Sequence, residues 1–284
     1  MKKVSFLGLG VMGYPMAGHL ASQGYEVTVY NRTTEKARQW CETYTGTLAE
    51  TPQEAVQQAD VVMMCVGNDD DVRQVGYSAL SAMQSGAVLI DHTTASAQVA
   101  RELYQACLDK HVGFLDAPVS GGQAGAENGQ LTIMVGGDEA VFSQAEAALN
   151  VYARHSQLLG ESGSGQLAKM MNQICIAGIV QGLAEALHFG QQAGLDCAQV
   201  VEVISKGAAQ SWQMENRATT MLAGEYDFGF AVDWMRKDLS IALDEARRNG
   251  STLALTALVD QYYADVQKAG GRRWDTSSLL TRLT

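Results

Sequence analysis

The sequence has few prolines and no closely spaced cysteine pair. Its 284 residues include three prolines and five cysteines, the latter scattered at positions 41, 65, 107, 175 and 197. An odd number of cysteines without a CxxC spacing disfavours both a disulfide framework and a zinc site, so we expect no metal and mostly buried thiols. With 46% hydrophobic and 18% charged residues, the composition is not that of a disordered chain and suffices for a sizeable core.

Positive charge is also scarce, because 20 Lys and Arg stand against 31 Asp and Glu, a formal net charge of −11. This balance disfavours nucleic acids and anionic membranes as partners, although local donors can still bind a small anion. No apolar run is expected to reach the length that a bilayer requires. The N-terminal MKKVSFLGLG lacks a small-residue cleavage site, so we expect a strand there and a cytoplasmic protein.

Up to about residue 160, short apolar runs alternate with helical stretches. Runs of Val, Met, Ile and Leu without polar interruption suit strands that are buried on both faces of a parallel sheet. The alternation predicts an α/β fold, a doubly wound Rossmann-like domain over residues 1–162. The expected strands are Val4–Leu7, Val27–Tyr30, Val61–Val66, Val88–Ile90, Gly113–Leu115 and Thr132–Val135, and the expected helices include 53–59, 70–84 and 95–111.

After the Gly- and Ser-rich stretch at 160–166 the strand pattern stops. Residues 163–284 are therefore expected to form an all-helical domain. Its first helix, Leu167–Gln192, is apolar nearly all round, which predicts burial between other elements. Further helices are expected at 196–206, 211–222, 231–249, 252–269 and 275–282.

A glycine turn joins the first expected strand to a helix. Gly8, Gly10 and Gly13 form GxGxxG, with Leu9, Val11 and Met12 between them. The first glycine permits a tight turn, the second lets a pyrophosphate approach the backbone, and the third lets helix and strand pack closely. The helix N-terminus attracts phosphate. An ordinary strand-to-helix turn is the alternative, but this setting favours dinucleotide binding.

The second strand ends in Asn31-Arg32-Thr33, where an NAD site usually has an acid for the ribose 2′-hydroxyl. Arg32 can bind a phosphate through two N–H groups and Thr33 can donate to it. The missing acid thus predicts NADP(H) as the cofactor, with NAD(H) as a possible second one. The alternative is that Arg32 is only a solvated loop charge.

The third long strand ends near Cys65, Val66 and Gly67, which should face the cofactor because they lie at the carboxyl end of a parallel strand. The acids Asp69–Asp71 follow at a helix start. Such a run more often caps a helix than binds a metal.

Four stretches, in order along the chain, resemble the β-hydroxyacid dehydrogenases: GLGVMGYPMAGHL, DAPVSGG, GSGQLAKMMN and WMRKDLSIALDEA. This family includes 3-hydroxyisobutyrate dehydrogenase, tartronate semialdehyde reductase and glyoxylate/succinic semialdehyde reductase. The resemblance covers essentially the whole chain. It implies hydride exchange between NAD(P) and a small hydroxy acid or its carbonyl partner, in a homodimer or homotetramer associated through the helical domain.

Two of these stretches contain candidate substrate and catalytic residues. Ser120, Gly121 and Gly122 offer a hydroxyl and successive N–H donors, an anion nest that by resemblance holds the substrate carboxylate; a plain surface turn is the alternative. Lys169 and Asn172 lie three residues apart on an apolar helix. By resemblance Lys169 is the catalytic lysine and Asn172 its neighbouring asparagine.

A lysine on an apolar helix either extends to the surface or has a function. Burial lowers the pKa of a lysine, which makes it a capable proton donor, and a cationic lysine would polarise a carbonyl.

The remaining candidates rest more on the resemblance. It implies that Lys237 contacts the cofactor with support from Asp238, and that Thr94 meets the nicotinamide side, with His92 as a structural neighbour. A solvated pair is the alternative for Lys237 and Asp238. Trp212 and Phe230 are candidate walls of the substrate pocket, although helical aromatics are more often core.

The sequence thus predicts an NADP-preferring oxidoreductase that acts on a small carboxylate substrate. Two alternatives remain: an imine reductase on the same fold, which typically lacks the lysine, and a dinucleotide-binding sensor without turnover. A phosphogluconate dehydrogenase is excluded because its helical domain is much longer.

Overall fold

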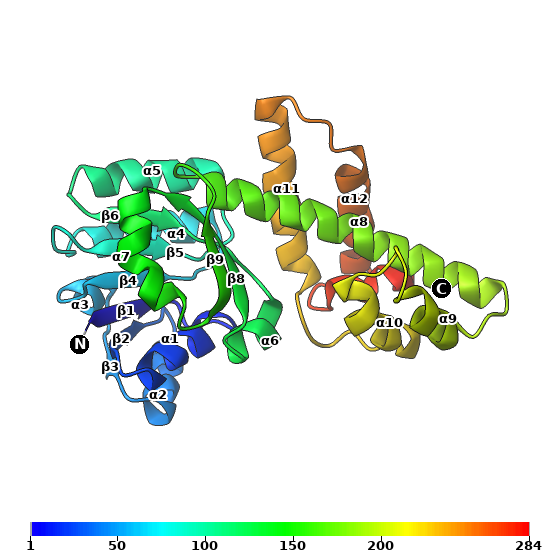
Figure 1. The fold of residues 1–284 in the computed structure, drawn as a ribbon, viewed down its shortest axis with the longest axis horizontal. Coiled ribbons are helices and arrows are strands. Elements are labelled where there is room, and N and C mark those ends of the chain that lie inside the picture. Colours follow the sequence, from blue (N-terminus) through cyan, green and yellow to red (C-terminus); the bar gives the residue numbers. More distant parts are fainter. Residues whose placement is uncertain (1, 284) are drawn as a thin grey trace. The chain divides into compact units, whose positions relative to one another are not determined.

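The computed structural model describes residues 2–283, which fall into two compact units that divide between Lys169 and Met170. The long helix α8 (Ser164–Gln192) begins in the first unit and continues into the second (Figure 1). The domain boundary expected at residues 162–163 stays a prediction. By compactness the first turn of α8 belongs to the first unit, because hydrogen bonds join it to the end of β6 and to the loop after β5.

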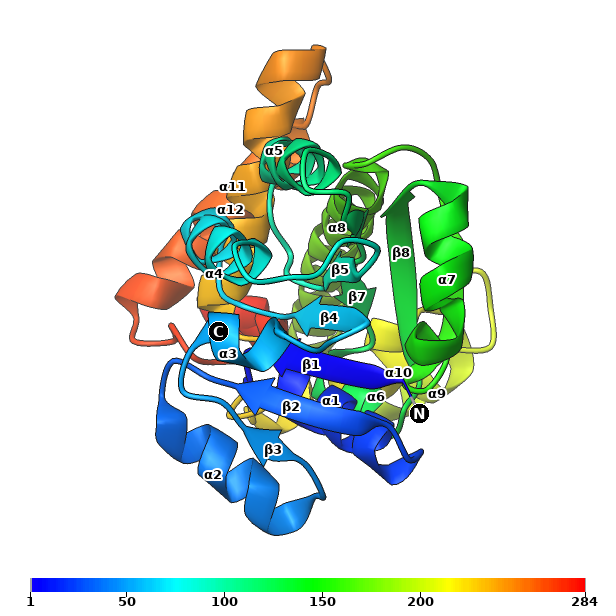
Figure 2. The same ribbon diagram turned by 90° about the vertical axis from the view of Figure 1, so that its left-hand side faces the viewer.

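The first unit is built on one sheet, whose strand order within the described residues is β3-β2-β1-β4-β5-β6-β8-β7, with β9 beside β8 (Figure 2). Strands β1 to β6 run parallel, whereas β8 is antiparallel to both β6 and β7. The strands are β1 (Lys3–Leu7), β2 (Glu26–Tyr30), β3 (Thr47–Leu48), β4 (Val61–Met64), β5 (Val88–Asp91), β6 (Gly113–Asp116), β7 (Val119–Ser120), β8 (Leu131–Gly137) and β9 (Ala153–Leu158).

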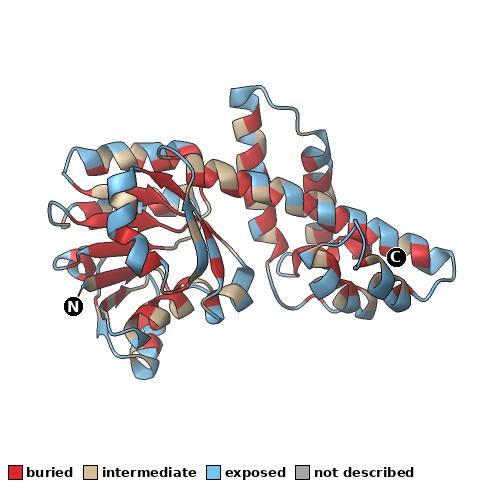
Figure 3. Ribbon diagram, viewed as in Figure 1, coloured by how far each residue is buried: buried red, intermediate tan, exposed pale blue. Residues whose placement is uncertain are grey.

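Successive residues of the central strands enter two different cores, one on each face of the sheet. Phe6 and Met63 face the core that α1, α2, α6 and α7 cover, where Trp40 is fully buried. Their neighbours Leu7 and Met64 face the core under α3, α4 and α5. Every residue of β4 and β5 is buried (Figure 3). This is the pattern of strands covered on both sides, and it explains why the strands read as unbroken apolar runs.

The helices of the first unit begin at recognisable caps. Asn68 caps α4 by accepting from the Asp71 backbone N–H at 3.0 Å, and Ser96 caps α5 by accepting from Val99 at 3.1 Å. The helices are α1 (Gly13–Ser22), α2 (Thr34–Thr43), α3 (Pro52–Val56), α4 (Asp69–Leu80), α5 (Ala97–Leu108), α6 (Gly122–Glu127) and α7 (Glu139–Leu149).

The fold expected from the sequence is confirmed, with two differences. All six expected strands are present, but β3, β7 and β9 were not expected, and β8 makes the sheet mixed rather than wholly parallel. Strands β3 and β7 have two residues each, too few for a periodic signal, and β9 is largely solvent-exposed and polar.

The second unit consists of helices packed around one core. Ala177 and Val180 of α8 pack with Met214, Leu239 and Tyr263 from later helices. The helices are α9 (Cys197–Ile204), α10 (Trp212–Ala223), α11 (Val232–Asn249), α12 (Ala254–Lys268) and the 3-10 helix η1 (Thr276–Arg282). The helices expected from the sequence are all present.

Helix α8 corrects one expectation. By length and composition it could cross a membrane, since its most apolar window has a mean hydropathy of 1.2, although 44% of that window is buried inside the structure. A buried helix of a helical domain passes the same test, so this finding is weak evidence for a membrane span.

Candidate active site

The glycine turn lies between β1 and α1 and is fixed by main-chain bonds. The Gly8 N–H donates to the Tyr30 carbonyl at 2.8 Å, and the Leu9 N–H donates to Asn31 Oδ1 at 2.8 Å. Gly8 has a φ of +100°, which disfavours any other residue. Leu9 is buried, whereas Val11 is 58% exposed. The turn and the tip of β2 are therefore one hydrogen-bonded unit.

The space around the three glycines differs, and the difference is the one expected for a dinucleotide-binding turn. A Cβ on Gly8 would lie 2.2 Å from the Cys65 carbonyl oxygen, and one on Gly13 would lie 2.0 Å from the Gly8 carbonyl oxygen. A Cβ on Gly10 would meet nothing within 4 Å. The first and third glycines thus serve close packing, while the second leaves open space where a pyrophosphate can approach the backbone.

The Asn31-Arg32-Thr33 tip has a second connection, which the sequence did not indicate. The Arg32 guanidinium pairs with Asp71 on α4 at 2.8 Å, with the arginine side chain 78% exposed and the aspartate side chain 20% exposed. Asn31 Nδ2 donates to the Thr33 carbonyl at 2.9 Å. Arg32 is therefore an accessible cation whose guanidinium already forms an ion pair with a neighbouring carboxylate.

The loops after β4 and β5 are linked to each other. The Val66 N–H donates to Thr93 Oγ1 at 2.9 Å, and the Thr93 N–H donates to Asp91 Oδ1 at 2.9 Å. Cys65, Val66, Gly67 and Thr94 thus lie on loops at the carboxyl ends of neighbouring parallel strands, where α/β sheets bind ligands.

The start of α8 is held by two residues that the sequence reasoning missed. Asp116, the last residue of β6, accepts the N–H of Gly163 at 2.7 Å and of Gln166 at 3.0 Å. Burial raises the pKa of Asp116 to about 6, and the N–H groups of Gly163, Gln166 and Gly165 act in the opposite direction. The buried amide of Gln166 contacts the backbone of Thr93 and Ala95. An acid followed some 45 residues later by a Gly-rich helix start would not single out either residue.

The candidate substrate loop directly follows β7. Gly121 and Gly122 have φ values of +135° and +61°, so two successive glycines adopt a backbone conformation that other residues rarely take. Both glycines are exposed, and Ser120 is half-buried. The conformation leaves N–H groups of this turn outside the regular sheet pattern, as an anion nest requires.

Lys169 is buried, with 7% of its surface exposed, on the first turns of α8. A lysine at that depth differs from a solvated one because most of its side chain is removed from water. Asn172 is half-buried three residues further along the helix, and its Nδ2 donates to Gln173 Oε1 at 2.8 Å.

In the second unit Asn172 belongs to a polar network that reaches α11. Gln173 is buried and its Nε2 donates to Asp238 Oδ2 at 2.7 Å. Asp238, with a side chain only 1% exposed, pairs with the Lys237 ammonium at 3.2 Å. The pair expected to be solvated or functional is thus partly buried, and Gln173, which the sequence reasoning missed, connects it to the asparagine.

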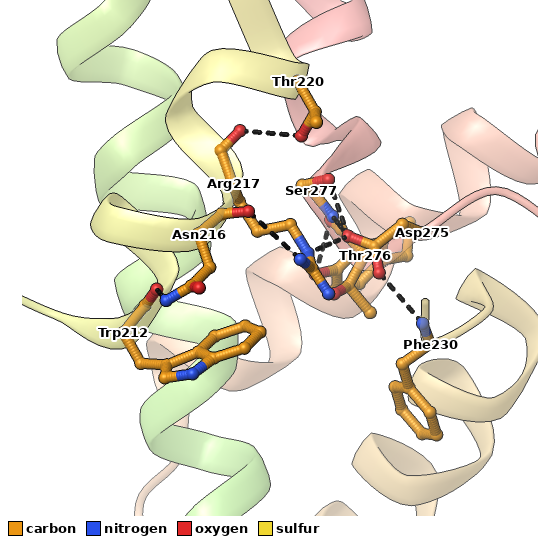
Figure 4. Close-up of polar contacts among 9 residues, drawn as sticks. Trp212, Asn216, Arg217, Thr220, Phe230, Asp275, Thr276 and Ser277 are labelled. Carbon is orange, nitrogen blue, oxygen red and sulfur yellow. Dashed lines mark hydrogen bonds and ion pairs between the residues drawn. The ribbon is translucent and has the colours of Figure 1, made fainter. Parts of the chain in front are cut away.

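Trp212 and Phe230 flank an ion pair of the second unit, and Phe230 is partly buried and packs against the core of that unit (Figure 4). The Arg217 guanidinium carbon lies 4.8 Å from the Trp212 ring centre and 5.0 Å from that of Phe228, and Arg217 Nε donates to Asp275 at 3.2 Å. Asp275 also accepts the Phe230 N–H at 2.9 Å. The ion pair therefore fixes the loop that carries Phe230, while Trp212 is 52% exposed.

His92 is fully enclosed beside these loops. Its Nδ1 donates to the Ala117 carbonyl at 2.7 Å and its Nε2 lies 2.8 Å from the Tyr152 hydroxyl. Burial lowers the pKa of His92 to about 4. A histidine that is neutral and bonded at both ring nitrogens is a poor proton donor near neutral pH.

The acids Asp69–Asp71 lie in the first turn of α4, and Asp69 accepts the N–H and the hydroxyl of Ser96. Among residues 2–283, no group of three or more His, Cys, Asp or Glu side chains gathers where it could hold a metal ion.

Two family models match the chain. Residues 3–160 match the NAD binding domain of 6-phosphogluconate dehydrogenase. Residues 163–283 match a model described as the NAD-binding of NADP-dependent 3-hydroxyisobutyrate dehydrogenase. Together they cover nearly all of the chain.

Individual proteins are similar over the same length. An uncharacterized oxidoreductase of Shewanella frigidimarina is 64% identical, covering 100% of this chain and 98% of that protein. The probable mitochondrial 3-hydroxyisobutyrate dehydrogenase-like 1 of Arabidopsis thaliana is 39% identical, covering 99% and 85%. A structure of Mycobacterium tuberculosis 3-hydroxyisobutyrate dehydrogenase with L-serine has a TM-score of 0.92 at 30% identity, covering 100% and 99%.

Proposed function

Because the chain belongs to the 3-hydroxyisobutyrate dehydrogenase family of β-hydroxyacid dehydrogenases, we propose that it interconverts a small hydroxy acid and its aldehyde or keto acid, with Lys169 as the proton carrier. The chain is an NAD(P)-dependent oxidoreductase of the 3-hydroxyacid dehydrogenase class. The proposal adds the substrate type, the catalytic group and a preference for NADP(H).

The observation that carries the proposal is the burial of Lys169. The residue is 7% exposed. It lies on a helix whose first turn is hydrogen-bonded to the end of β6 and to the loop after β5. Carbonyl reduction needs a proton at the substrate oxygen, and a lysine ammonium removed from bulk water can supply it.

The chain's own residues would divide the chemistry between binding and proton transfer. When bound at Gly8–Gly13, the nicotinamide cofactor supplies a hydride for reduction or accepts one in oxidation. In reduction, Lys169 Nζ donates a proton to the substrate oxygen, and the resulting amine regains a proton from water. In oxidation, the neutral amine takes the hydroxyl proton. Asn172 orients the same oxygen by hydrogen bonding.

The substrate carboxylate would bind at Ser120–Gly122. Two successive glycines with positive φ present the backbone as an anion nest, and the Ser120 hydroxyl adds a donor. A nest on the loop after β7 fixes the anion by position rather than by a cationic side chain. This favours short acids whose reacting carbon lies close to the carboxylate. The Mycobacterium tuberculosis relative, whose structure contains L-serine, is consistent with such a ligand.

An absorbance screen tests the function. Oxidation of NADPH and reduction of NADP would be followed with C2–C5 aldehyde acids, keto acids and hydroxy acids, and with cyclic imines in parallel. Turnover of a hydroxy acid or its carbonyl partner is expected. Turnover of imines alone would favour an imine reductase, and binding of NADPH without any turnover would favour a sensor.

Arg32 is proposed to recognise the 2′-phosphate of NADP. Its exposed pair with Asp71 stabilises little by itself, so a phosphate can compete for the guanidinium. We expect Arg32→Ala to weaken NADPH binding about 10-fold or more while leaving NADH binding unchanged, because only NADPH has the phosphate.

Fluorescence titration with both cofactors measures this difference. Asp71→Asn is the matched control: it removes the competing acid and should leave NADPH binding equal or tighter. Asn31→Asp retains the acceptor for the Leu9 N–H and should shift preference toward NADH. Equal losses for NADPH and NADH in Arg32→Ala would contradict the assignment.

We also propose that the protein is a homo-oligomer formed through the helical unit. On α8, Ile179 and Phe189 are 41% and 70% exposed, and on α12 Leu255 and Leu258 are 55% and 47% exposed. A Cβ on Gly178 would lie 3.2 Å from Leu255, so the two helices present one apolar surface at this point. Light scattering should give a mass of two or more times 30.4 kDa. Ile179→Glu should lower that mass, whereas an unchanged mass would reject this surface.

A further inference from the structure

We propose that Gln166, supported by Asp116, is a positioning residue that fixes Lys169 relative to the loops after β4 and β5. The inference rests on the proposed role of Lys169 as proton carrier. It concerns how the first unit holds the first turn of α8.

The Gln166 amide bridges the backbone on both sides of Thr94. Its Nε2 donates to the Thr93 carbonyl at 2.7 Å, and its Oε1 accepts the Ala95 N–H at 3.0 Å. The residue is fully buried. Both ends of the amide are therefore used, and neither bond is weakened by competing water.

The main chain of the same residue is bonded to a different strand. The Gln166 N–H donates to Asp116 Oδ2, and the Gly163 N–H donates to Asp116 Oδ1. A carboxylate at this place satisfies N–H groups that the helix leaves open and interacts favourably with the helix dipole. Gln166 thus joins the end of β6 to the loop after β5.

Close backbone contacts pack this helix start against β6 and β8. A Cβ on Gly165 would lie 2.5 Å from the carbonyl oxygens of both Asp116 and Met134. A Cβ on Gly136 would lie 2.8 Å from the backbone nitrogens of Ser164 and Gly165. The glycines allow the helix to sit against β6 and β8, and the Gln166 amide then fixes its position toward β5.

Lys169 follows Gln166 by three residues, which is less than one turn of α8. Its backbone position is therefore set by the contacts of Gln166. Because Val66 donates to Thr93, the loop after β4 belongs to the same network. Without the Gln166 amide, Lys169 would still be present, but its position relative to the loops would be less well defined. A displacement of about 1 Å can cost about 10²-fold in rate.

Gln166→Glu gives the sharpest test, because it keeps the shape of the side chain. One oxygen still accepts the Ala95 N–H, but an ionised carboxylate cannot donate to the Thr93 carbonyl, whereas a protonated one can. The kcat of Gln166→Glu relative to wild type should be reduced about 10²-fold at pH 8 and should recover as the pH falls. Cofactor affinity, from fluorescence titration, should change little.

The charged groups around this turn are common to both proteins. They are Asp116 on β6, Asp91 on β5, Arg101 beside Gly163 and Lys169 itself. The ratio of the two kcat values removes the titration that variant and wild type share, and what remains reports the introduced carboxyl together with its coupling to Asp116 and Lys169. Gln166→Met, uncharged and of similar length, should show the loss without the recovery.

Hydrogen exchange gives a readout that does not depend on turnover. Amides of residues 166–169 should exchange faster in Gln166→Met than in wild type. Gln181→Ala is the control, because it removes another buried amide of α8. It should leave kcat unchanged even if it lowers stability.

Two outcomes would overturn the inference. One is a wild-type kcat in Gln166→Met, and the other is a ratio of kcat values for Gln166→Glu that does not vary with pH. If instead Lys169→Ala kept its turnover, the proposed proton carrier would be wrong. In that case the hydrogen-exchange result would still decide whether Gln166 fixes the helix start.

Discussion

Lys169→Ala is expected to lower kcat by about 10³-fold or more while NADPH affinity stays within a few-fold of wild type. Positioned proton transfer contributes about 10²–10⁴-fold, and the loss of a cation near the developing oxyanion adds to it. Cofactor binding should survive because the glycine turn and the Asn31-Arg32-Thr33 tip lie in other parts of the chain, after β1 and after β2. Stopped-flow or steady-state assays with fluorescence titration measure the two quantities separately.

The variant also removes a buried side chain, so its effect on packing needs a control. Lys169→Met keeps most of the aliphatic chain and lacks only the ammonium. It should be as inactive as Lys169→Ala, with a melting temperature close to that of wild type, because it keeps most of the buried apolar volume. Parallel losses of turnover and cofactor affinity in both variants would contradict the assigned role, since they would indicate a disturbed fold.

The sequence predicted the layers of this fold because its strongest patterns are local. Strands such as β4, VVMM, are buried on both faces and need no information about their neighbours to be recognised. The direction of β8 could not be read in the same way. An antiparallel pairing with β6 depends on how the chain returns after the loop at residues 117–130, and apolar periodicity is the same in either direction.

In the candidate site, too, local features could be recognised from the sequence and distant contacts could not. Glycines, a lysine on an apolar helix and a Gly-rich loop are visible in short stretches, and their roles stay predictions. Their partners were missed: Gln166 contacts a backbone atom 73 residues away, and Arg217 pairs with an aspartate 58 residues away. A glutamine in a helix start and an arginine in a surface helix have no local signature, because only the folded chain brings their partners near.

Arg32 shows the opposite case, in which a residue already noticed in the sequence has an unexpected neighbour. The tip after β2 was interpreted by what it lacks, an acid for the ribose hydroxyl. The structure supplies an acid from elsewhere, Asp71 of α4, whose carboxylate pairs with Arg32. If Arg32 has its proposed role, cofactor preference would depend on a pair of residues 39 positions apart rather than on the tip alone.

Gly10→Ala is expected to bind NADPH about 10- to 100-fold more weakly and yet to fold like the wild type. Gly10 does not have a positive φ, and its added methyl would meet no atom of the protein within 4 Å. The free energy of unfolding should therefore stay nearly the same. The methyl would instead occupy the space through which a pyrophosphate approaches the backbone, and forcing a group into such a contact costs about 1–3 kcal/mol.

Gly13→Ala is the matched comparison, because here the added methyl should lower the stability of the fold itself. Its Cβ would lie 2.0 Å from the Gly8 carbonyl oxygen and 2.9 Å from the Phe6 ring, so β1 or α1 must shift. We expect a loss of about 2 kcal/mol or more in stability, measured by urea unfolding without cofactor. If Gly10→Ala bound NADPH as tightly as wild type, the cofactor would not approach over Gly10. If both variants lost stability equally, the open space at Gly10 would not exist in solution.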